Sequence, residues 1–200
     1  MSHLIDQIKK GAKNFAAYVK KIIDDFFKWL EDLFKSGKAD EVFEGIIKLS
    51  DEAEILLKKY ADNAILGYTK LQRPTVVSVL EGNGKRVFAY SNKAKLAANE
   101  IPKGLHPLVK KWLKEADEVI QQRPQHGKCA EPSAISKWLW EFDPNGKMTI
   151  EQARKQFDGV VSKAINIESK KIKRIQHGTY KEACKSCNPL LEFFNITEVH

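Results

Sequence analysis

Residues 75–90 read TVVSVLEGNGKRVFAY and carry the clearest β-strand signal in the chain. The runs 75–80 and 86–90 are rich in β-branched and aromatic residues, and Gly82-Asn83-Gly84 lies between them. Residues of these types favour strands, and an Asn-Gly pair is typical of a tight hairpin turn. The pattern therefore predicts a β-hairpin over residues 75–90.

Helical periodicity surrounds this hairpin on both sides, because apolar residues recur there at three- and four-residue spacings. The predicted helices cover residues 13–35, 40–60, 107–122, 129–140, 149–157 and 183–194. Alternating or β-branched residues predict two more strands, at 160–167 and 196–199. The order of elements predicts a mixed α/β domain over residues 71–200, preceded by a helical N-terminal segment over residues 1–70.

The two N-terminal helices suggest a helical hairpin whose apolar faces need a partner. The candidate partners are the other helix of the pair, the following domain and a membrane surface. The mixture of acidic residues and lysines on both helices favours packing within the protein. No apolar run is long enough to cross a bilayer. The first twenty residues contain Asp6, Lys9, Lys10 and Lys13, so they lack the apolar core of a signal peptide.

The positive charge of the chain is concentrated after the predicted N-terminal segment. Of 200 residues, 42% are hydrophobic and 30% charged, which is typical of a globular protein, and the net charge is +8. Residues 1–69 hold 11 Lys/Arg and 12 Asp/Glu, whereas residues 70–200 hold 23 and 14. This balance favours a polyanionic partner, and a solvated basic surface without a specific partner is the alternative.

The chain has three cysteines, Cys129, Cys184 and Cys187, and the odd number argues against a complete disulfide framework. Metal binding uses all three. We expect both cysteine motifs at helix N-termini, where the helix dipole favours thiolates. A zinc ion with three protein ligands keeps its fourth position open for water.

Glu131 follows Cys129 by two residues, so we expect its carboxylate beside that fourth position, where it can act as general acid and base. The alternative is a structural zinc site with His126 or His177 as fourth ligand. In that case Glu131 is an ordinary first-turn glutamate.

The segment HGKCAEPSAI, residues 126–135, and the segment ACKSCNPLL, residues 183–191, resemble the two motifs of the cytidine-deaminase superfamily. The chain is most similar to the YwqJ-like deaminase domains at the C-termini of bacterial polymorphic toxins, over about residues 75–200. The resemblance implies a three-layer α/β/α sandwich. It also implies that Cys129, Cys184 and Cys187 bind Zn²⁺ and that Glu131 moves the protons.

By the same resemblance, the protein deaminates cytosine in a nucleic acid whose base is single-stranded or flipped. It implies a toxin that a specialised secretion system delivers into the cytoplasm of a target cell, a cognate immunity protein as partner, and a delivery or linker role for residues 1–70. Five residues are candidates for contacts with the substrate: His126, Ser133, Lys171, Arg174 and His177.

Two other functions remain open at this point. One is a free-nucleoside cytidine deaminase, which would not explain the basic excess. The other is a non-catalytic, zinc-stapled module that binds nucleic acid. The sequence also leaves open cytosine against adenine, DNA against RNA, and the preferred flanking nucleotide.

Overall fold

The predicted hairpin is present in the computed structural model of the chain. Strand β1 (Val76–Gly82) pairs antiparallel with strand β2 (Lys85–Tyr90), and Val79 lies opposite Phe88. Asn83 and Gly84 form the turn with φ angles of 53° and 72°, the left-handed conformation that a two-residue hairpin turn favours. The prediction for residues 75–90 is therefore confirmed.

The structure describes residues 19–21, 23–28, 31, 32, 35, 47–91, 101, 103–121, 126–168 and 176–200. The chain forms two compact units, Met1–Ile47 and Lys48–His200, and each is described by itself. In the first unit the described residues between 19 and 35 are helical, as predicted, and the rest of the predicted helix 13–35 lies outside the described residues. Over the described part of the chain, no helix combines the length and apolar character needed to span a bilayer.

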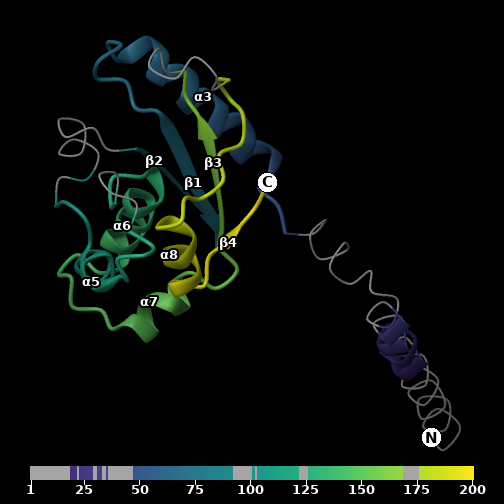
Figure 1. Cartoon of the computed structure of the whole chain (residues 1–200). Coiled ribbons are helices and arrows are strands. Elements are labelled where there is room, and N and C mark those ends of the chain that lie inside the picture. Colours follow the sequence, from purple (N-terminus) through teal and green to yellow (C-terminus); the bar gives the residue numbers. More distant parts are fainter. Residues whose placement is uncertain are drawn as a thin grey trace, which may run out of the picture. The chain divides into compact units, whose positions relative to one another are not determined.

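The second unit contains a four-stranded mixed sheet with the strand order β2-β1-β3-β4 (Figure 1). Strand β3 (Val161–Asn166) is antiparallel to β1 and parallel to the short strand β4 (Thr197–Glu198). Both strands confirm the predictions at 160–167 and 196–199. The parallel pair β3–β4 needs a crossover connection, and residues 167–196 supply it.

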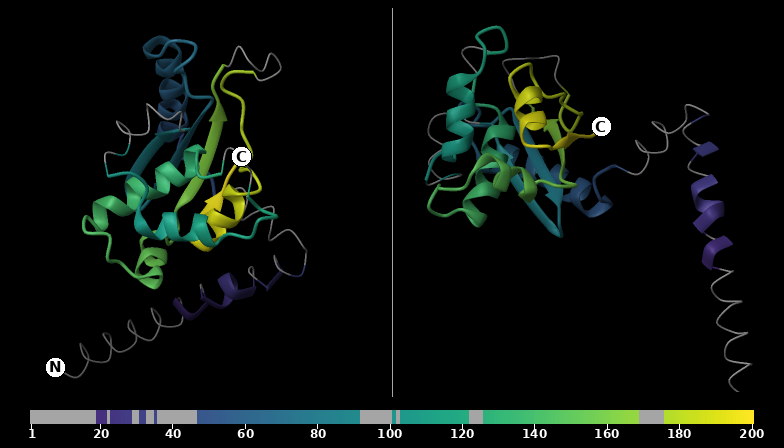
Figure 2. Two further views of the ribbon diagram at one scale, coloured as in Figure 1. Left: turned by 60° about the vertical axis from the view of Figure 1, so that its left-hand side comes forward. Right: turned by 90° about the horizontal axis from the view of Figure 1, so that it is seen from below.

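Helices cover both faces of this sheet, which gives three layers. Helix α3 (Asp51–Gly67) packs on one face, and helix α6 (Ala130–Phe142) packs on the other together with α5 (Pro107–Glu115), α7 (Ile150–Gln156) and α8 (Cys187–Phe193) (Figures 1 and 2). Successive side chains of a strand point to opposite faces of the sheet, so each strand contributes to the hydrophobic core on both sides. Val79 and Phe88 face α3, whereas Leu80 and Val87 face α6. The predicted mixed α/β sandwich is confirmed.

Two predicted helices, at 40–60 and 107–122, have boundaries that differ from the structure, whereas a third begins where the sequence predicts. The helix predicted over 40–60 is α3, which begins after Ser50, because the Ser50 hydroxyl accepts the N–H of Ala53 and caps the helix. The helix predicted over 107–122 ends at Glu115, and the Asp117 carboxylate then accepts the N–H of Val119 in a local turn. By contrast, α7 begins directly after Thr149, at the start of the predicted range 149–157, and Thr149 and Gln152 form a capping box there.

Helix α3 belongs to the unit that carries the sheet, whereas the sequence predicts a domain boundary after residue 70. The reason is its buried face, which follows an i, i+4, i+8, i+11 pattern through Ala53, Leu57, Ala61 and Ala64, each 0% exposed. Three alanines in that stripe let the helix approach strands β1 and β3 closely. The following domain is one of the three partners that the sequence predicts for this helix.

Deleting residues 1–47 should therefore be tolerated, whereas deleting residues 1–70 should unfold the second unit. The longer deletion removes α3 and exposes Val77, Val79 and Ile165, and each such side chain contributes about 1.5–3 kcal/mol by its burial. Their sum is comparable with a typical domain stability of about 5–15 kcal/mol. Urea unfolding of both truncated chains would measure this. Equal stability of the two would contradict the assignment of α3 to the core.

Candidate metal and catalytic site

Cys129 is the N-cap residue of α6, in an extended conformation with φ −70° and ψ 169°. Its side chain makes no capping hydrogen bond to the helix. The following three residues, Ala130, Glu131 and Pro132, form a buried first turn, in which proline lacks only an N–H that would have no partner within the helix. The sulfur at position 129 is therefore at the helix start, as predicted, and is not used to cap the helix's own N–H groups.

Cys184 and Cys187 are presented by a turn rather than by one face of a helix. The helix predicted over 183–194 begins only at Cys187. The carbonyl oxygen of Cys184 accepts the N–H groups of Cys187 and Asn188, at 2.7 and 2.9 Å, so the turn is tight enough to place both sulfurs together. The two sulfurs are thus close together, as the predicted metal site requires, but Cys184 lies before the helix.

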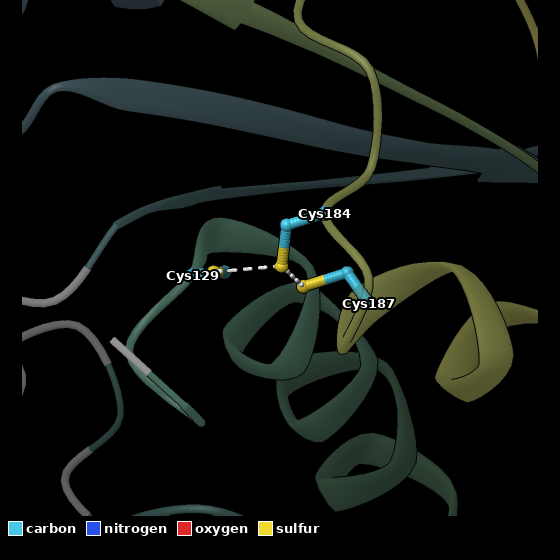
Figure 3. A group of neighbouring side chains, drawn as sticks. All are labelled: Cys129, Cys184 and Cys187. Carbon is cyan, nitrogen blue, oxygen red and sulfur yellow. Dashed lines mark hydrogen bonds between the residues drawn. The ribbon is translucent and has the colours of Figure 1, made fainter. Parts of the chain in front are cut away.

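The three sulfurs meet in one cluster (Figure 3). The Sγ atom of Cys184 lies 3.6 Å from that of Cys129 and 3.4 Å from that of Cys187, and all three lie within 4.8 Å of one another. Zinc–sulfur bonds of about 2.3 Å in a tetrahedron put the sulfurs about 3.8 Å apart. The donor set and its spacing therefore fit one zinc-like ion held by three thiolates.

The contacts within the cluster favour negative charge on one sulfur over the other two. Hydrogen bonds with Cys129 and Cys187 lower the pKa of Cys184 to about 2, helped by the backbone N–H groups of Ser186 and Cys187. The same contact with Cys184 raises the pKa of Cys129 to about 12, and contacts with the other two thiols raise that of Cys187. Full ionisation of all three therefore needs a cation among them.

Glu131 lies beside the cluster and is 4% exposed. Its Oε2 atom accepts a hydrogen bond from the Cys187 sulfur at 3.3 Å, yet it is outside the group of three mutually close ligand atoms. Burial raises the pKa of Glu131 above its ordinary value. A carboxyl group with a raised pKa beside a candidate metal-binding cluster is suited to take up and release a proton.

Neither histidine proposed as a fourth ligand is in this cluster. His126 Nε2 donates to the carbonyl oxygen of Leu113 at 2.8 Å, and its Nδ1 lies 3.0 Å from the Ser186 hydroxyl. His177 Nδ1 accepts the N–H of Glu168 at 3.3 Å, and its Nε2 lies 2.8 Å from Asp62 Oδ1. Both rings thus tie segments of the fold together, and His126 ties the Cys184–Cys187 turn to the end of α5.

The other candidates for substrate contacts divide into two groups. Ser133 is fully buried on α6, one turn after the cap residue Cys129. Lys171 and Arg174 lie outside the described residues.

Two residues that the sequence did not point to lie next to the cysteine turn: Glu198 contacts the residue before the turn, and Tyr180 contacts Glu198. The carboxylate of Glu198 accepts the N–H of Ala183, directly before Cys184, and it accepts the hydroxyl of Tyr180. Neither residue belongs to a recognisable motif. Both residues lie near the cysteines because β4 and Tyr180 pair with the same strand, β3. No local sequence pattern reveals this pairing.

An α/β/α sandwich with a three-sulfur cluster at the start of one helix and a buried glutamate beside it defines a deaminase-like protein with a candidate metal site. A family model for YwqJ-like deaminases matches residues 67–196. The chain therefore belongs to the YwqJ-like deaminase family, as the resemblance of its two motifs implied. Neither a curated protein nor a solved structure matches the chain.

Proposed function

We propose that the protein is a zinc-dependent hydrolytic deaminase that converts cytosine to uracil in nucleic acid. The observation that carries this proposal is the buried carboxylate of Glu131, 3.3 Å from the sulfur of Cys187 in a cluster of three cysteines. A purely structural site has no use for a buried acid beside its ligands, because burying a carboxylate costs free energy.

In this proposal Cys129, Cys184 and Cys187 hold the ion. A zinc ion bound there would lower the pKa of a water molecule in the coordination position that the three cysteines leave free. Glu131 would take one proton from the attacking water and deliver it to N3 of the base, and it would then carry the second proton from the new C4 hydroxyl to the amino group, which leaves as ammonia. Water thus replaces the amino group at C4, and Glu131 ends in the state in which it began.

The charge of the second unit supports a polynucleotide substrate over a free nucleoside. Residues 48–200 hold 26 Lys/Arg and 18 Asp/Glu, so this unit carries the whole net charge of +8. Contacts between these basic residues and phosphates would strengthen binding, and the affinity would fall as the salt concentration rises. Because the base must reach a buried glutamate, the substrate is single-stranded or its base is flipped out.

The toxin role, the cognate immunity protein and the delivery by a specialised secretion system are proposed from the family to which the chain is similar. The described helical residues between 19 and 35 would then belong to a delivery or linker segment. A basic surface of the second unit would be a natural target for an acidic immunity protein.

Sequencing of DNA and RNA from bacteria that express the chain tests the substrate. We expect C-to-U changes, read as C-to-T, concentrated in one polymer and one sequence context, and absent from cells that express the Glu131→Gln variant. Turnover of free cytidine without such changes would support the nucleoside deaminase instead. A zinc-loaded chain with neither activity would support the zinc-stapled binding module.

A further inference from the structure

The Cys184–Cys187 turn is part of an excursion of the chain, residues 180–198, that starts and ends at the edge of β3. Tyr180 pairs with Ile165 in an isolated antiparallel bridge, and the N–H of Lys181 donates to the carbonyl of Ala164. The chain then departs, forms the Cys184–Cys187 turn and α8, and rejoins the same edge at β4, where Glu198 lies opposite Ser162. Both ends of the excursion are thus fixed to one strand.

A single carboxylate oxygen closes the base of this excursion. Glu198 Oε1 accepts the backbone N–H of Ala183 at 2.7 Å and the Tyr180 hydroxyl, also at 2.7 Å. Burial and the Glu198 carboxylate raise the pKa of Tyr180, so its hydroxyl keeps the proton that it donates. One bond connects the last strand to the residue immediately before Cys184, and the other connects it to Tyr180.

We propose that Glu198 is a positioning residue of the metal site, which fixes the backbone before Cys184 and so holds that sulfur where it meets Cys129 and Cys187. The proposal rests on the metal site of the proposed function and is independent of the substrate. The family match ends at residue 196, so nothing is carried over to Glu198 from it.

The other end of the turn has its own attachment. Ser186 is buried, its hydroxyl lies 2.7 Å from the carbonyl oxygen of Ile120, and His126 contacts the same hydroxyl. Loss of Glu198 should therefore free the Cys184 end of the turn and leave Cys187 in place. The effect on the metal should be a weaker third ligand rather than the loss of the whole cluster.

The full-length chain with Glu198→Ala should bind zinc about 10- to 100-fold more weakly, the range typical for partners that orient metal ligands. Competition with a chromophoric chelator measures this affinity, and the sulfur-to-cobalt absorption of the Co²⁺-loaded protein reports the thiolate ligands directly. We expect Glu198→Ala to lose part of this absorption and Glu198→Gln, which keeps an oxygen acceptor, to restore most of it.

Glu182→Gln is the matched control, because Glu182 is an exposed glutamate one residue before Ala183. It should retain the native affinity and spectrum. A folded Glu198→Ala variant with native zinc affinity and cobalt spectrum would overturn the proposal. If this variant does not fold, Tyr180→Phe decides: a several-fold loss of affinity supports the proposal, and a native value overturns it. A native chain that binds no zinc would instead refute the proposed function itself.

Discussion

Replacing Glu131 with glutamine should lower deamination by about 10²- to 10⁴-fold, the usual contribution of a positioned acid and base. Glutamine has nearly the same shape as glutamate and fits the same buried place in the first turn of α6. It cannot take up and release a proton, however, so the chemistry should stop while binding continues. The steady-state release of ammonia from a single-stranded substrate, or the formation of uracil within that strand, measures the loss.

The same variant should keep its zinc and its stability. Burial raises the pKa of Glu131, which means that the charged form is disfavoured in the fold, and a neutral amide relieves that cost. Glu192→Gln on α8 removes one charge from an exposed glutamate and should retain full activity. A fully active Glu131→Gln variant with native zinc content would remove Glu131 from the catalytic mechanism.

The parts of the fold that follow from local patterns could be predicted from the sequence. The hairpin over residues 75–90 depends on its own strand residues and turn, and the capping box at Thr149 needs only four residues. The start of α6 at Cys129 is equally local, since Pro132 is compatible with a first helical turn and with little else in a helix. The presence of a candidate metal-binding cluster follows from residue types and spacing.

Features that depend on tertiary pairing could not be predicted. Helix α3 has the same kind of amphipathic pattern as a helix that packs on another helix, and only its alanine stripe against β1 assigns it to the sheet. Cys184 precedes α8, and the backbone before it contacts Glu198 through the N–H of Ala183. That contact joins two residues 15 positions apart and requires the register of β3 with β4.

The position of Cys129 suggests that the helix start is adapted to metal binding at some expense of stability. Serine, threonine, aspartate and asparagine are the favoured N-cap residues, because their side-chain oxygen accepts a free N–H of the first turn. Cys129 stands in the N-cap conformation without making such a bond. A serine at this position would cap the helix, and it would remove a zinc ligand.

Cys129→Ser should therefore separate metal binding from folding. We expect the metal-free variant to be as stable as the native metal-free chain or more stable, by up to about 1 kcal/mol from the new cap. Its zinc content and its deamination should both be lost. Urea unfolding without metal, metal analysis and a deamination assay measure the three effects. In thermal unfolding, added zinc should raise the melting temperature of the native chain only.

Lys128→Ala is the control, because Lys128 is exposed and directly precedes the cap residue; it should retain zinc and activity. Stoichiometric zinc in Cys129→Ser would exclude Cys129 as a ligand. The variant is most informative beside Glu131→Gln. A zinc-stapled binding module would lose zinc with Cys129→Ser and be indifferent to Glu131→Gln, whereas a deaminase must lose its chemistry with either change, and for two different physical reasons.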